Sequence, residues 1–184
     1  MRRRIARRGG KDYNVAMKIR SIPALLLATV MTCGAAHAED LPSRTPGLWQ
    51  STTTVTGPDG QALANAVNVV TVSCVDALTD EKFLMSGASS CAALTVSGSG
   101  GSYAVDGTCA EQAQQVQIHE TLLYADTKTV KLTAHITTGA HDLTVHSQLA
   151  WQGDCLAGMQ PGDEGSVQNG AFSKADNIND PYNQ

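Results

Sequence analysis

Apolar and polar residues alternate along most of the chain from residue 48 onward, and the alternation is clearest between residues 116 and 151. A period of two is typical of a strand with one buried face, whereas an amphipathic helix repeats every three or four residues. Turn residues at 126–128 and 138–142 separate three such runs. The sequence therefore predicts a three-stranded antiparallel meander whose core-facing side chains are Val116, Ile118, Leu122, Tyr124, Val130, Leu132, Ala134, Ile136, Leu143, Val145, Leu149 and Trp151.

Two hairpins are predicted before this meander. The first joins residues 48–56 to 65–74 through a turn at 57–60, and the second joins 92–97 to 103–109 around the glycine-rich segment 98–101. Between them, residues 76–87 lack the alternation, and Asp76 or Thr79 can cap a short helix that ends at Gly87. We therefore expect a mainly β domain of about seven strands and one short helix, in which a single antiparallel sheet is curled as a barrel, half-barrel or sandwich.

The two ends of the chain differ from this central part. Residues 1–38 combine a basic start, an apolar run at 23–30 that is too short to span a bilayer, and a small-x-small site at residues 36–38. We interpret them as an N-terminal extension and a signal peptide that is cleaved near Ala38, with Met1 or Met17 as the start. Residues 39–163 then form the β domain, and residues 164–184 are polar enough to predict a flexible tail.

Cleavage would change the charge of the protein. Residues 1–38 hold eight of the 13 basic residues and one of the 17 acidic residues, so the mature chain would carry a net charge of −11 in place of −4. An acidic surface repels phosphate groups and anionic lipids. We therefore expect no nucleic-acid partner and no stable membrane insertion of the mature chain.

Four cysteines remain after cleavage, which suggests two disulfides in an oxidising compartment. Cys91 and Cys109 lie at about equal distances from the turn of the second hairpin, within disulfide range of each other if the strands are opposed. If the last strand of the meander lies beside the first strand, Cys74 approaches Cys155. We favour these two pairings over Cys74–Cys91 with Cys109–Cys155, and over free thiols or a metal site, since no CxxC pair is present.

Histidines and tryptophans are the remaining candidates for chemistry. His119, His135 and His146 fall on the polar side of neighbouring strands, where His135 can oppose both of the others. Such a row could bind zinc or copper, and the simpler interpretation is a solvated outer face. Trp49 and Trp151 have core parity, so they either fill the core where the first and last strands meet or line the mouth of a cavity for an apolar ligand.

Four segments resemble one known family: PGLWQ at 46–50, CVDALTD at 74–80, the pair Cys91 and Cys109, and WQGDCLAGMQPGD at 151–163. They are similar to the exported proteobacterial proteins catalogued as domain of unknown function 3617. The resemblance implies a small periplasmic or secreted β domain, and it carries no activity that could be assigned to a residue.

The expected function is therefore non-enzymatic binding of an envelope protein or a small molecule after export to the periplasm. No GxSxG elbow and no phosphate-binding loop is present in the sequence. The alternatives are a lipocalin-like carrier of a small apolar molecule, and a metal-binding protein or metal-dependent hydrolase that uses the histidine row.

Overall fold

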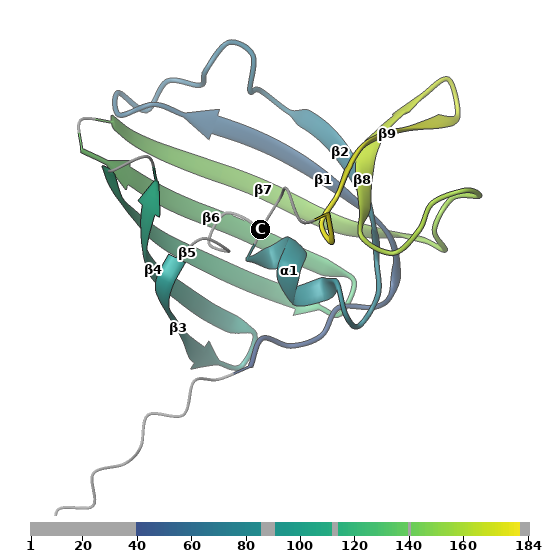
Figure 1. The fold of residues 1–184 in the computed structure, drawn as a ribbon, viewed down its shortest axis with the longest axis horizontal. Helices are drawn as coiled ribbons and strands as arrows, with labels where there is room; N and C mark the ends of the chain where they lie inside the picture. The colour runs from purple at the N-terminus through teal and green to yellow at the C-terminus, as the bar shows by residue number, and fades with distance from the viewer. Residues whose placement is uncertain (1–39, 86–90, 112–113, 140, 181–184) are drawn as a thin grey trace, which may run out of the picture. The chain divides into compact units, whose positions relative to one another are not determined.

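The computed structural model describes residues 40–85, 91–111, 114–139 and 141–180. The predicted signal peptide, its predicted cleavage site and the two candidate starts lie outside the described residues. The described part holds one short helix, α1 (Asp80–Leu84), and nine strands (Figure 1). The strands are β1 (Gly47–Thr56), β2 (Val69–Val75), β3 (Cys91–Ser99), β4 (Ser102–Glu111), β5 (Gln114–Asp126), β6 (Thr129–Thr138), β7 (His141–Gly153), β8 (Asp163–Gln168) and β9 (Ala171–Asn177).

All nine strands form one antiparallel sheet in the order β3-β4-β5-β6-β7-β1-β2-β8-β9. Each of the predicted hairpins and the meander is present, and β1 pairs with β7 from Leu48 to Thr56. In the described chain β3 and β9 have only one neighbouring strand each, so the sheet is not closed. The predicted fold class, a mainly β domain with a single antiparallel sheet, is confirmed.

The prediction of about seven strands ending in a flexible tail was wrong for residues 164–177. They form most of β8 and all of β9, a hairpin that turns at Asn169 and Gly170, both with positive φ. Asn-Gly is a strong signal for a two-residue hairpin turn, and the low apolar content of the segment obscured it. The hairpin contributes Phe172 to the adjoining core cluster. Backbone pairing between β8 and β9 holds the rest of it, so a hairpin at the edge of the sheet needs few apolar residues.

Trp49 on β1 and the residues opposed to it across the sheet, such as Trp151 on β7, face one side of the sheet, which we call the inner face. Val130 on β6 and Tyr124 on β5 face the same side. The largest core cluster lies there and joins Trp49, Leu122 and Val130 to Leu84 of α1. A smaller cluster occupies the opposite side, the outer face, where Leu48, Val72 and Cys74 of β1 and β2 pack against Met159. The helix and the loop before β8 therefore cover different sides of the same strands.

The helix is shorter than predicted. It begins after Thr79 and ends before Met85, whereas the predicted end at Gly87 lies outside the described residues. Asp76 stabilises the preceding turn, since its carboxylate accepts hydrogen bonds from the backbone N–H groups of Leu78 and Thr79. Within the described chain, no helix has the length and apolar character needed to cross a membrane.

Candidate functional site

A buried carboxyl group interrupts the apolar inner face. Glu120 lies on β5 between Ile118 and Leu122, and the strand's alternation therefore directs all three side chains inward. Its cross-strand neighbours are Val105 on β4 and Ala134 on β6, which are almost completely buried. The alternation from Val116 to Tyr124 contained this signal, because Glu120 is the one charged residue on the predicted core parity.

Glu120 has no compensating partner among the described residues. The residue is 5% exposed, and its Oε1 atom makes no hydrogen bond. Burial raises the pKa of this carboxyl group to about 7. Buried polar atoms in proteins are nearly always paired, so an unpaired one calls for a functional or energetic explanation.

Tyr124 is a second unpaired polar group on the same strand and face. Its hydroxyl group is buried without a hydrogen-bond partner in the described part of the chain, and burial raises its pKa above the ordinary value. Its ring packs edge-on against Tyr103, with ring centroids 5.8 Å apart. The inner face of β5 thus presents two unpaired oxygen atoms, separated by Leu122.

The inner face of β1 and β7 is less completely covered than that of β5. Ser51, Thr53 and Val55 of β1 and Val145 and Ser147 of β7 are half-buried. The hydroxyl groups of Ser51 and Ser147 both lie within hydrogen-bond distance of that of Thr53, at 3.1 and 2.8 Å. Val145 also pairs with Ala134, the neighbour of Glu120. The half-buried aliphatic and hydroxyl groups of β1 and β7 therefore lie on the same face of the sheet as the Glu120 carboxyl group, with β6 between β7 and β5.

The three candidate histidines do not form one row. His119 opposes His135 across β5 and β6 as predicted, but His135 opposes Thr144 on β7, and His146 opposes Thr133. The interpretation that His135 also opposes His146 was wrong, because the register of β6 and β7 places them two positions apart. The described residues contain no group of three or more metal-ligating side chains placed to hold an ion. Metal binding by these histidines stays a prediction.

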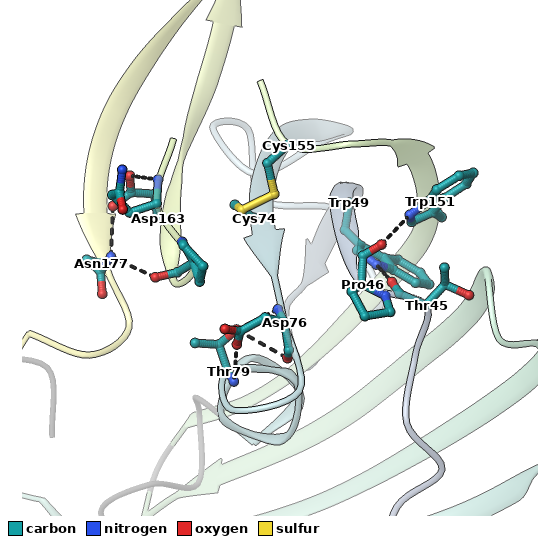
Figure 2. Close-up of a disulfide and its surroundings, with 12 residues drawn as sticks. Thr45, Pro46, Trp49, Cys74, Asp76, Thr79, Trp151, Cys155, Asp163 and Asn177 are labelled. Carbon is teal, nitrogen blue, oxygen red and sulfur yellow. Dashed lines mark hydrogen bonds between the residues drawn. A yellow bond between two sulfur atoms is a disulfide. The ribbon is translucent and has the colours of Figure 1, made fainter. Parts of the chain in front are cut away.

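Both tryptophans lie where β1 meets β7, and their positions are opposed in the sheet. Trp49 is 1% exposed and donates its indole N–H to the carbonyl of Thr45, whereas Trp151 is half-buried and donates to the carbonyl of Pro46 (Figure 2). Lys128 covers the Trp151 ring, with its Nζ atom 4.0 Å from the ring centroid. These contacts give both rings a packing role, and their participation in a ligand cavity stays a prediction.

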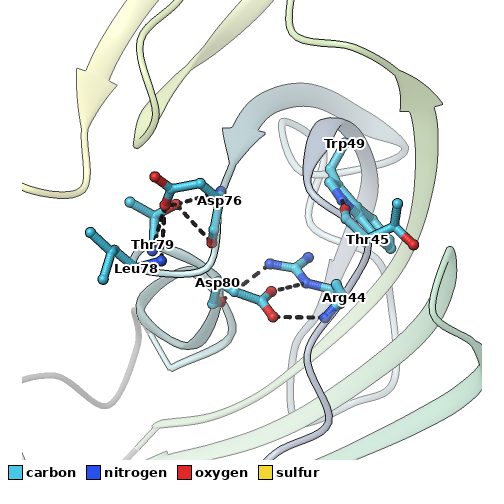
Figure 3. A network of polar contacts seen from close by, with 7 residues as sticks. All are labelled: Arg44, Thr45, Trp49, Asp76, Leu78, Thr79 and Asp80. Carbon is cyan, nitrogen blue, oxygen red and sulfur yellow. Dashed lines mark hydrogen bonds and ion pairs between the residues drawn. The ribbon is translucent and has the colours of Figure 1, made fainter.

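A buried ion pair fixes α1 to the segment before β1. The Arg44 Nε atom lies 2.6 Å from Asp80 Oδ1, and the backbone N–H of Arg44 donates to Oδ2 (Figure 3). The guanidinium group also stacks on Trp49, 4.6 Å from the ring centroid. Because both charged groups are buried, their attraction replaces lost hydration only while the pair stays intact.

The cysteines form Cys74–Cys155 and Cys91–Cys109. The first links β2 to the segment after β7, and the second links opposed positions of β3 and β4, beside a register shift that follows Cys91. Beside the first disulfide, Gly47 has a φ of +134°, and a Cβ atom there would clash with the Gly153 carbonyl. The segments 46–50, 74–80 and 151–163 thus meet at one end of the sheet and brace it (Figure 2).

Together these features define a small β domain, built on one open antiparallel sheet and cross-linked by two disulfides. The family model described as "Protein of unknown function (DUF3617)" matches residues 44–155, and the chain belongs to this family. No curated protein and no solved structure matches the chain. The matched range includes Glu120 as well as the braced segments 46–50 and 74–80.

Proposed function

We propose that the mature chain is an exported, non-enzymatic binding protein whose inner face receives a small amphipathic molecule. In this proposal the apolar part of the ligand contacts β1 and β7, and a hydrogen-bond donor or cationic group meets Glu120. The buried, unpaired carboxyl group is the observation that carries the proposal. A ligand that supplies the missing partner would remove the energetic penalty of leaving this group unpaired.

Export to the periplasm is supported by the signal-like segment of the sequence and by the two disulfides. Disulfides persist in oxidising compartments and are rare in the cytosol. Mass spectrometry of the protein recovered from a periplasmic fraction tests this part. We expect a chain that begins near Glu39, lacks four hydrogen masses relative to the reduced form, and carries any ligand retained under native conditions. A chain that keeps residues 1–38 and four free thiols would contradict export.

A binding role is favoured over catalysis because no side chain of the described residues hydrogen-bonds to Glu120 Oε1. Catalysis by a carboxyl group usually needs a second titratable group or a nucleophile in contact with it. The cross-strand neighbours of Glu120 are valine and alanine, and its neighbours on the inner face of β5 are isoleucine and leucine. Such apolar surroundings suit recognition of a ligand group, and the four side chains named here offer no titratable group or nucleophile.

Ligand binding is testable with N-phenyl-1-naphthylamine, a neutral fluorescent probe with an apolar body and one N–H donor. We expect its fluorescence to rise on binding the mature protein. The substitution V145W places an indole on the inner face between Glu120 and β1, and it should weaken probe binding at least tenfold. Q148W on the same strand is the matched control, because Gln148 is exposed on the outer face.

Circular dichroism and thermal melting establish that both variants remain folded. A loss of affinity in V145W that Q148W does not share supports the inner face as the binding site. Equal losses in the two variants, or no fluorescence change with the unmodified protein, would contradict the proposal.

Binding of an envelope protein is the second candidate function, and exposed aliphatic side chains around the loop between β1 and β2 favour it. Leu63, Val67, Val69 and Val70 lie in or beside the loop between β1 and β2, and each is between 42% and 49% exposed. Exposed aliphatic side chains lose less by contacting another protein than by staying in water, so this loop is a candidate contact site for another protein. Cross-linking in the periplasm from position 67, compared with position 59 at the tip of the same loop, tests it. A specific protein adduct from position 67 and not from position 59 would favour this function over binding of a small amphipathic molecule.

A further inference from the structure

Four polar side chains form one continuous row on the outer face of the sheet. Asp106 on β4 opposes His119 on β5, His119 opposes His135 on β6, and His135 opposes Thr144 on β7. Directly opposed residues of antiparallel strands have Cβ atoms about 5 Å apart, so the two imidazoles are immediate neighbours.

The outer members of this row orient the two imidazole rings. His119 Nδ1 lies 2.6 Å from Asp106 Oδ1, and His135 Nδ1 lies 3.1 Å from Thr144 Oγ1. Each Nδ1 atom therefore faces away from the other histidine. Since Nδ1 and the Cδ2–Nε2 edge lie on opposite sides of an imidazole ring, both Nε2 edges lie on the side where the histidines face each other. When His119 donates its Nδ1–H to the Asp106 carboxylate, the lone pair on His119 Nε2 is free to bind a ligand.

Three members of this row, Asp106, His119 and His135, line a shallow groove of about 380 Å³. The side chains of His119 and Asp106 are 53% and 54% exposed, so an ion from solvent can reach them. The remaining polar lining consists of hydroxyl and amide groups that can hydrogen-bond to metal-bound water: Thr95, Thr108, Gln117 and Thr137.

We propose that His119 and His135 bind one divalent transition-metal ion through their Nε2 atoms, with Asp106 as a positioning residue. A carboxylate that accepts the Nδ1–H of a metal-binding histidine is a common arrangement, because it fixes the tautomer and makes Nε2 more basic. Imidazole ligands suit copper, zinc and nickel, and affinity for a given site rises toward Cu²⁺. Water completes the coordination, since the described residues offer no third ligand here.

The test is calorimetric titration of the mature, tag-free protein with CuCl₂ and ZnCl₂ at pH 7.5 in a buffer that does not chelate metals. We expect one Cu²⁺ per chain, bound more tightly than Zn²⁺, and at least a tenfold loss of affinity in H119A and in H135A. H146A is the matched control, because His146 is exposed on the same face and opposes Thr133. It should bind Cu²⁺ as the unmodified protein does.

Electron paramagnetic resonance of the Cu²⁺ complex distinguishes the role of Asp106 from a merely structural one. D106N should keep two imidazole nitrogens bound to copper but lose about tenfold in affinity, as loss of an orienting partner typically does. D106E should restore part of the affinity, and H119A should show one imidazole nitrogen. Absence of Cu²⁺ binding, unchanged affinity in H119A, or an equal loss in H146A would overturn the proposal.

Discussion

The substitution E120Q tests the central structural claim, that an inward-facing carboxyl group lacks a partner. Glutamine has nearly the same shape as glutamate and cannot ionise. Burial raises the pKa of Glu120 from 4.5 to about 7, so the folded protein retains this proton at a pH where the unfolded chain has released it. The folded state is therefore penalised progressively as the pH rises from 4.5 through 7.

The size of the effect follows from the two pKa values. A difference between 4.5 and about 7 corresponds to about 3 kcal/mol of unfolding free energy at pH values above 7. Below pH 4.5 the group is protonated in both states, and its ionisation contributes no penalty. E120Q should therefore match the unmodified protein at pH 4.5 and exceed its stability by about 3 kcal/mol at pH 8.

Urea denaturation followed by circular dichroism, repeated at pH values from 4.5 to 8, measures this difference. Other shifted groups, including Asp163 with its lowered pKa and Glu164 with its raised pKa, remain in both proteins and cancel in the comparison. E81Q on the exposed side of α1 is the control and should show no such rise. If the difference in unfolding free energy between E120Q and the unmodified protein did not change with pH, the conclusion that burial raises the pKa of Glu120 would be refuted. A loss of stability in E120Q at pH 8 would show that the charged carboxylate has a favourable partner.

Three further predictions concern the braced end of the sheet, each measured as a change in urea-unfolding free energy. Replacing Cys74 and Cys155 together with alanine should cost about 4.5 kcal/mol on the chain-entropy estimate, since the disulfide closes a loop with a sequence separation of 81, and equal stability of the reduced form would contradict this. D80A should cost about 3 kcal/mol, because it leaves a buried guanidinium group without its counter-charge, and a cost below about 1 kcal/mol would mean that water replaces the carboxylate. G47A should be destabilising by about 3 kcal/mol or more because its Cβ atom meets backbone, whereas G60A, with nothing near its Cβ position, should cost about 1 kcal/mol. Similar costs for these two glycine variants would show that the close approach at residue 47 can relax.

The strands with strong alternation were predictable because half-burial imposes a period of two on the sequence. The meander of β5, β6 and β7 and the hairpin of β3 and β4 occur where the pattern placed them. The hairpin of β8 and β9 was missed because few of its side chains reach a core. At the edge of a sheet, backbone pairing and turn residues such as Asn169 and Gly170 outweigh hydrophobic pattern.

The candidate sites divide in the same way. Their residue types and facing directions follow from parity, which places Glu120 inward and His119 outward on the same strand. Which histidines oppose one another depends on strand register, and a shift of two positions keeps every side chain on its face while changing all its partners. Parity could therefore not distinguish His146 from Thr144 as the neighbour of His135.

The sequence by itself determined that this protein is a mainly β domain with one antiparallel sheet, because alternation is a local consequence of burying one face of each strand. The segments that resemble the family, the five cysteines and the charge of the chain are likewise properties of the sequence. Only the tertiary structure decided which cysteines pair, that Arg44 meets Asp80, and that Glu120 lacks a hydrogen-bond partner for its Oε1 atom among the described residues. These depend on contacts between residues far apart in the chain, and such contacts are set by the register and order of all nine strands together.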